Sequence, residues 1–96
     1  MKDLKSIKKI LKDETPELER LFKVKKIGVF GSYARGDATR TSDIDILVEL
    51  HEPIGWLLVD LRKHLETMLG IEVDLITMST LMPQRSEKVL KEVVYI

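Results

Sequence analysis

Two aspartates near the middle of the chain are the first residues whose type and spacing could do chemistry. Asp43 and Asp45 open an apolar run that ends at residue 50, and one residue separates them. Alternate residues of a β-strand face the same side, so both carboxylates would point one way, with α-carbons about 6.5–7 Å apart. At about 5 Å and an effective dielectric of about 20, two such charges repel by roughly 3 kcal/mol. The pair therefore predicts a cation that neutralises it.

A third carboxylate, Asp74, lies between Val73 and Leu75 in a second β-rich run. If the two runs form neighbouring strands, all three carboxylates converge. Oxygen-only ligands favour Mg²⁺, which keeps several waters and recruits phosphate oxygens. A purely structural interpretation stays open, because Asp-x-Asp is common in turns and caps and because an edge strand can expose an acid.

A glycine-serine pair, Gly31-Ser32, follows a β-rich run over residues 26–30 and precedes a predicted helical turn through residues 33–35. Glycine lets a phosphate approach the backbone closely. Free N–H groups and the Ser32 hydroxyl can donate to phosphate oxygens, and Arg35 can add a charge-assisted hydrogen bond. The alternative is an ordinary turn with Arg35 on the surface. Combined with the aspartates, the pattern describes a phosphate cradle followed, after ten residues, by a metal site.

This spacing resembles the signature of the nucleotidyltransferase superfamily that includes DNA polymerase beta. The stretch GSYARGDATRTSDIDILV, residues 31–48, is similar to the minimal nucleotidyltransferases, the smallest branch of that superfamily. Asp74 matches the third acid of the family, and the resemblance is close over residues 25–78. It implies that residues 1–96 form a single minimal nucleotidyltransferase domain.

The resemblance also implies roles for individual residues. Asp43 and Asp45 bind two Mg²⁺ ions that hold the triphosphate of ATP. Asp74 helps bind the catalytic metal and assists deprotonation of the attacking hydroxyl. The Gly-Ser turn holds the β- and γ-phosphates, and two further residues are candidates for phosphate contact or loop support. The implied nucleotide-binding residues are Gly31, Ser32, Arg35 and Ser42.

The acceptor follows from the resemblance and from no residue of this chain. Proteins similar to this one are antitoxins that transfer AMP from ATP to a tyrosine of a HEPN-domain toxin. Two alternatives stay open: an antitoxin that neutralises its partner by binding without catalysis, and a small-molecule nucleotidyltransferase. The lack of length for an acceptor domain counts against the second alternative. Homo- and hetero-oligomers both remain open.

The elements that must position these groups follow the order α-α-β-(short α)-β-α-β-α. Apolar spacing predicts a helix over residues 2–13, a second helix starting at 15–17, and a long helix over 53–69. Strands are predicted over 26–30, 43–50 and 71–76. Ser79 or Thr80 would cap a last helix with Val89, Leu90 and Val93 on its apolar side. We expect an α/β or α+β fold with a mixed sheet of at least three strands flanked by helices.

Composition narrows the function classes. The chain has 96 residues, 16 basic and 16 acidic side chains and no cysteine, which excludes disulfides, thiolate zinc sites and cysteine nucleophiles. No apolar run approaches the roughly 20 residues that span a bilayer, and the N-terminus lacks the apolar core of a signal peptide. We therefore expect a cytoplasmic protein without membrane contact. The zero net charge argues against direct nucleic-acid binding.

Overall fold

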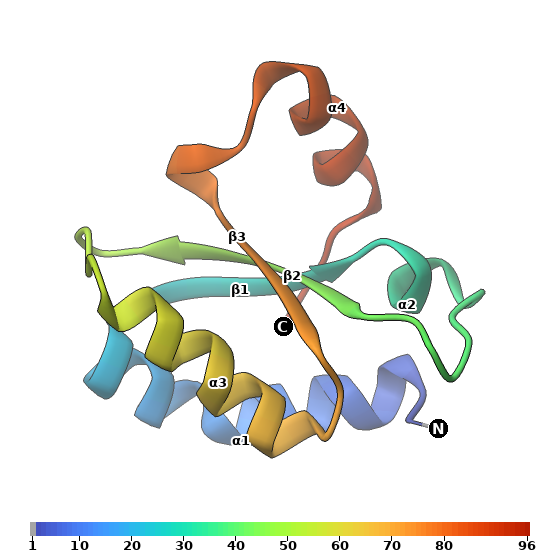
Figure 1. The fold of residues 1–96 in the computed structure, drawn as a ribbon, viewed down its shortest axis with the longest axis horizontal. Coiled ribbons are helices and arrows are strands. Elements are labelled where there is room, and N and C mark those ends of the chain that lie inside the picture. Colours follow the sequence, from blue (N-terminus) through green and yellow to red (C-terminus); the bar gives the residue numbers. More distant parts are fainter. Residues whose placement is uncertain (1) are drawn as a thin grey trace.

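A mixed sheet forms the middle layer of the structure, a computed structural model that describes residues 2–96. The elements are α1 (Leu4–Phe22), β1 (Val24–Phe30), α2 (Ser32–Arg35), β2 (Ile44–Leu50), α3 (Leu57–Leu69), β3 (Val73–Thr77), the 3₁₀ turn η1 (Met78–Thr80), α4 (Pro83–Glu92) and β4 (Val94–Tyr95). The four strands lie in the order β3-β2-β1-β4. α1 and α3 cover one face, and α4 lies over the other (Figure 1).

Strand directions make the sheet mixed. β2 and β3 are parallel, whereas β1 is antiparallel to both β2 and β4. The α3 crossover covers one face of the β2–β3 pair, as parallel connections require. This arrangement confirms the predicted α+β fold class and the expectation of at least three strands.

The two sides of β2 have different surroundings. Its core-facing residues are fully buried against α1 and α3: Ile44, Ile46 and Val48. Leu47 points to the other side, where it packs with Phe30 and with Val89 of α4. Because side chains alternate along a strand, Asp45 shares the side of Leu47. β2 therefore presents its acid to the side that α4 covers.

The predicted pair of N-terminal helices is wrong, because α1 runs without a break through Pro16. A proline inside a helix costs about 3 kcal/mol, since it removes a backbone hydrogen bond and crowds the preceding turn. A continuous buried stripe offsets that cost: Ile7, Leu11, Leu18 and Phe22. The Thr15 hydroxyl donates to the Leu11 carbonyl at 2.9 Å, so Thr15 does not cap a new helix. Within residues 2–96, no helix is long and apolar enough to cross a membrane.

The C-terminal prediction also needs correction. Ser79 and Thr80 belong to the 3₁₀ turn after β3, and α4 starts at Pro83, whose fixed φ suits a first helical position. Leu90 is exposed rather than buried. The short strand β4 was not predicted; it pairs with β1, opposite Gly28. A Cβ at Gly28 would lie 2.5 Å from a methyl of Val93, so this glycine lets the C-terminal segment approach β1.

Candidate active site

The turn between β1 and α2 brings the backbone of Gly31 close to the carboxylate of Asp45. Gly31 adopts φ 71° and ψ −151°, a conformation that favours glycine. A Cβ at this position would overlap the Oδ2 atom of Asp45 on the neighbouring strand. Arg35 N–H donates to the Gly31 carbonyl at 3.0 Å and closes the short helix that the sequence predicts here. Glycine is thus required for both the backbone conformation and the contact with Asp45.

Asp45 and Asp74 lie opposite each other on the parallel strands β2 and β3. Partial burial, the charge of Asp74 and a hydrogen bond between the two carboxyls raise the pKa of Asp45 to about 6. Asp74 itself is exposed. Three carboxylates are expected to converge if these strands are neighbours; the strands are neighbours and bring Asp45 and Asp74 together. A cation bound between them would favour the ionised form and lower the pKa of Asp45 again.

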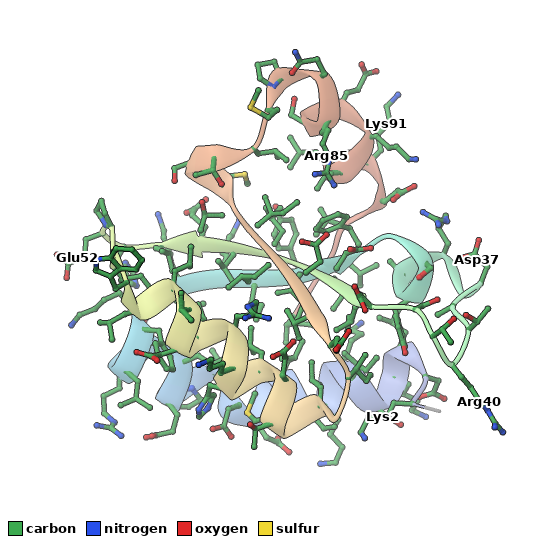
Figure 2. All side chains as sticks on the ribbon, in the orientation of Figure 1. Lys2, Asp37, Arg40, Glu52, Arg85 and Lys91 are labelled. Atoms are coloured by element: carbon green, nitrogen blue, oxygen red, sulfur yellow. The ribbon has the colours of Figure 1, made fainter. Side chains whose placement is uncertain are left out.

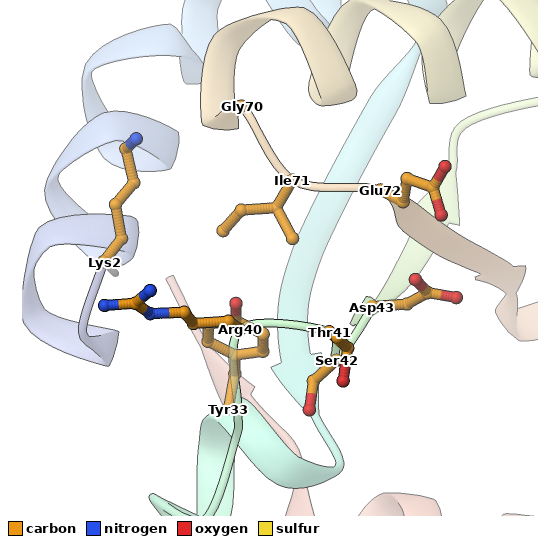
Figure 3. A pocket seen from close by; sticks show the side chains of 9 residues that line it. All are labelled: Lys2, Tyr33, Arg40, Thr41, Ser42, Asp43, Gly70, Ile71 and Glu72. Carbon is orange, nitrogen blue, oxygen red and sulfur yellow. The ribbon is translucent and has the colours of Figure 1, made fainter.

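Asp43 takes a more peripheral position. It is exposed and directly precedes β2, and its charge makes a small contribution to raising the pKa of Asp45. Asp43 lines a hollow of about 500 Å³ at the end of the sheet, together with Arg40 and Ser42 (Figure 3). The Ser42 hydroxyl accepts from the Thr39 N–H at 2.9 Å and so holds the loop before β2. The structure places Ser42 in this loop rather than beside Gly31.

The acid pair suits magnesium better than it suits a metal held by protein alone. Among residues 2–96, no three Asp, Glu or His side chains lie close enough together to hold one metal ion. Mg²⁺ is usually bound by one or two carboxylates, with waters and substrate phosphates completing its octahedron. Two carboxylates beside a backbone turn whose N–H groups can donate to a phosphate fit that requirement. Asp45 and Asp74, with Asp43 at the margin, are the residues that would hold the ion.

A cleft of about 410 Å³ separates the Gly31 turn from α4. Phe30 and Asp45, at the ends of the central strands, are among the residues that line it. The residues that line its two sides are Gly31, Ser32 and Arg35 on one, and Gln84, Arg85, Lys88, Val89 and Glu92 on the other. Arg85 lies on the side of α4 that faces the sheet (Figure 2), and its charge partly counteracts the rise in the pKa of Asp45. The cleft therefore joins the predicted phosphate cradle, one predicted metal ligand and a basic wall.

The part of the site that was not predicted from the sequence is the α4 side of the cleft, with its cations Arg85 and Lys88. Arg85, Lys88 and Glu92 are spaced three and four residues apart, so they share one face of α4. That spacing was visible in the sequence. Nothing in the sequence told which element this face would meet, because α4 has Val89 as its buried residue and packs on the sheet through a small contact.

Arg35, a predicted phosphate ligand, already has carboxylate partners. Its Nη1 donates to both carboxylate oxygens of Glu92, at 3.1 and 3.2 Å, and its Nε donates to Asp37 at 3.3 Å. The hydrogen bonds to Asp37 and Glu92 raise the pKa of Arg35 further above its usual value. Gly31 N–H also donates to Glu92, at 3.3 Å. Arg35 thus lines the cleft in an ion-paired state.

Known proteins with similar sequences cover the whole chain. A family model described as a nucleotidyltransferase domain matches residues 4–96. The protein adenylyltransferase MntA of Thermococcus cleftensis is 44% identical over 97 residues, which span 100% of this chain and 98% of that protein.

Solved structures agree with this assignment. A structure provisionally named as a minimal nucleotidyltransferase has a TM-score of 0.78 and 33% identity, covering 97% of this chain and 95% of that one. A toxin–antitoxin complex with AMP-PNP has a TM-score of 0.70 and 28% identity, covering 93% of this chain and 68% of that one. With the family match over residues 4–96, these likenesses show that the chain belongs to the nucleotidyltransferase domain family.

Proposed function

We propose that this chain is an Mg²⁺-dependent protein adenylyltransferase that transfers AMP from ATP to a tyrosine hydroxyl of a HEPN-domain toxin and thereby acts as its antitoxin. The observation that carries the proposal is the position of Asp45. Its carboxylate lies against Gly31, and Asp45 is the register partner of Asp74 on the neighbouring strand, so a phosphate held by the turn would lie beside both acids. Nucleotidyl transfer needs this juxtaposition of phosphate cradle and metal ligands.

The residues divide the reaction between them. The bond between the α- and β-phosphates of ATP breaks, a new bond joins the α-phosphorus to the acceptor oxygen, and pyrophosphate leaves. Gly31, Ser32 and the cations Arg85 and Lys88 line the cleft that would hold the β- and γ-phosphates. Bound Mg²⁺ supplies positive charge for the entering and leaving oxygens. Asp74 is exposed and can accept the proton of the acceptor hydroxyl.

The relatives support the nucleotide and the acceptor class. The similar protein from Thermococcus cleftensis is named a protein adenylyltransferase. One similar solved structure is a toxin–antitoxin complex with AMP-PNP, an ATP analogue. The choice of a HEPN toxin and of tyrosine rests on the family resemblance described above.

The test is co-expression with a HEPN-domain toxin, followed by intact-mass measurement and peptide mapping of that toxin. We expect added AMP units on a tyrosine. A double variant with Asp45→Asn and Asp74→Asn should leave the toxin unlabelled. Asp13→Asn is a matched control, because Asp13 is an exposed acid on α1, on the other face of the sheet.

Three outcomes would overturn the proposal. Labelling that survives the double variant would show that these acids are not the catalytic pair. A toxin that is neutralised equally well by the double variant, and without added mass, would identify an antitoxin that works by binding alone. Labelling of small molecules but of no toxin would favour the third function class.

A further inference from the structure

A carboxylate of the chain itself occupies the phosphate side of the cleft. Glu92, the last residue of α4, accepts hydrogen bonds from the Gly31 N–H and from the Arg35 guanidinium. Both donors belong to the turn predicted to bind nucleotide. The Glu92 side chain is 20% exposed, so it lies mostly inside the cleft wall. An anion therefore already sits where a phosphate would find its donors.

The position of Glu92 is unexpected because cations lie around it in the same cleft. Three cations line it, Arg35, Arg85 and Lys88, and on the α4 side Glu92 is the acid among the lining residues. A triphosphate carries several negative charges, and a fixed carboxylate at the same donors would repel it. A wall built only to attract phosphate would carry a neutral acceptor or another cation at this position.

We propose that Glu92 is a resident anion that the phosphates of the nucleotide displace, so that this residue sets the affinity of the cleft for nucleotide. The proposal rests on the proposed function, because it takes the Gly31 turn to be the phosphate site. In the free protein Glu92 neutralises Arg35 and satisfies the Gly31 N–H. In the nucleotide complex both donors turn to phosphate oxygens and Glu92 swings out.

The contacts of Glu92 are weak enough to be exchanged. Its hydrogen bonds measure 3.1 to 3.3 Å, at or beyond the long end of the usual range for N–H···O bonds. The Arg35 side chain is 44% exposed, and ion pairs of exposed side chains contribute little to stability. A charge-assisted bond from Arg35 to a phosphate is stronger than these contacts. Arg85 and Lys88 lie on earlier turns of α4 and stay available to the phosphates.

The experiment compares the nucleotide affinity of the full chain with that of Glu92→Gln, by calorimetric titration with ATP and Mg²⁺. Glutamine keeps one acceptor oxygen for the Gly31 N–H or Arg35 but removes the charge. We expect the Kd of the variant to fall about three- to fivefold, the upper part of the effect that one partly exposed charge produces. Glu87→Gln is the matched control, because Glu87 lies on the same helix, is exposed and pairs with Lys91. Its Kd should stay within about twofold of the unsubstituted protein.

A second measurement uses the unsubstituted protein, so that a folding defect of the variant cannot hide the answer. Inorganic pyrophosphate with Mg²⁺ should shift the NMR signals of the Gly31 amide and the Arg35 side chain, together with the side-chain carboxyl carbon of Glu92. Shifts at Gly31 and Arg35 without a change at Glu92 would overturn displacement.

The outcomes separate the inference from the proposed function. If the unsubstituted chain binds no ATP with Mg²⁺, the proposed function fails. If it binds ATP and Glu92→Gln binds with equal or lower affinity, the proposed function stands and the inference alone is overturned. In that case Glu92 is a positioning residue that holds the turn in place for the nucleotide.

Discussion

The two faces of the sheet are built by the same strands but differ in almost every other respect. Under α1 and α3 lies one continuous cluster of fully buried aliphatic side chains. Under α4 the buried cluster found among residues 2–96 consists of Phe30, Leu47 and Val89, and charged residues line the cleft beside it. The first face supplies most of the apolar burial, and the second supplies the cleft. The alternation of side chains along β2 thus separates stability from chemistry, with Ile44 and Ile46 on one side and Asp45 on the other.

Removing a side chain from the α3 face should give the largest loss of stability. Leu65 of α3 is fully buried, so Leu65→Ala should lower the free energy of unfolding by about 2–5 kcal/mol. Denaturant titration measures this loss. Below the unfolding transition, the Kd for ATP with Mg²⁺ should be unchanged. A large change in Kd in protein that is still folded would show that the two faces are coupled.

Changing an acid on the α4 face should lower the rate of AMP transfer without lowering stability. Asp45→Asn should slow AMP transfer by at least about 100-fold, the upper end of losses measured for residues that only support metal ligands. Stability should stay equal or rise, because the repulsion between Asp45 and Asp74 is removed. Transfer assays and thermal melting check the two halves. A strongly destabilised variant would contradict the separation of roles.

The small apolar cluster under α4 offers an intermediate case. Val89→Ala should cost about 1–2 kcal/mol, because it removes buried methyl groups from a site that is 4% exposed. It should also weaken nucleotide binding, since Val89 fixes the face of α4 that carries Arg85 and Lys88. Denaturant titration and calorimetry on one sample show whether stability and affinity fall together.

The smallest expected effect of the α4 face is on the pH dependence of stability. The pKa of Asp45 rises from 3.8 to about 6 on folding, so the folded protein holds this proton more tightly than the unfolded chain does. Stability from this group is therefore present below about pH 4 and is lost as the pH rises through about 6. The loss should be on the order of 1 kcal/mol after allowance for solvent screening. Asp45→Asn should abolish this component in melting curves recorded between pH 4 and pH 7.

Local patterns predicted the parts of the fold that local forces decide. The alternation around residues 44–48 identified the core side of β2, and the Gly31-Ser32 pair identified a turn at the end of β1. The adjacency of Asp45 and Asp74 was conditional on neighbouring strands, and the structure shows that β2 and β3 are neighbours. The predictions of the core side and of the turn needed only periodicity and turn chemistry.

Long-range packing decided the rest. The helix α1 continues through Pro16 because the buried stripe on both sides of it packs on the sheet, which no local propensity reveals. Likewise, β4 is two residues long and exists because Gly28 lets it approach β1. The roles of Arg85, Lys88 and Glu92 depended on where α4 lies, so they emerged only with the structure.

The attachment of α4 also determines how the molecule can come apart. Besides the buried Val89, further contacts hold this helix. They include the hydrogen bonds of Glu92 with Gly31 and Arg35, the pairing of the short β4 with β1 at Gly28 and Val29, and the Ile96 N–H donating to the Ile27 carbonyl at 3.0 Å. Segments with little buried apolar area open at lower free energy than the core. The amides of α4 and β4 should therefore exchange with solvent through a partial unfolding that leaves α1, α3 and the central strands intact. One wall of the cleft can detach while the rest of the domain stays folded.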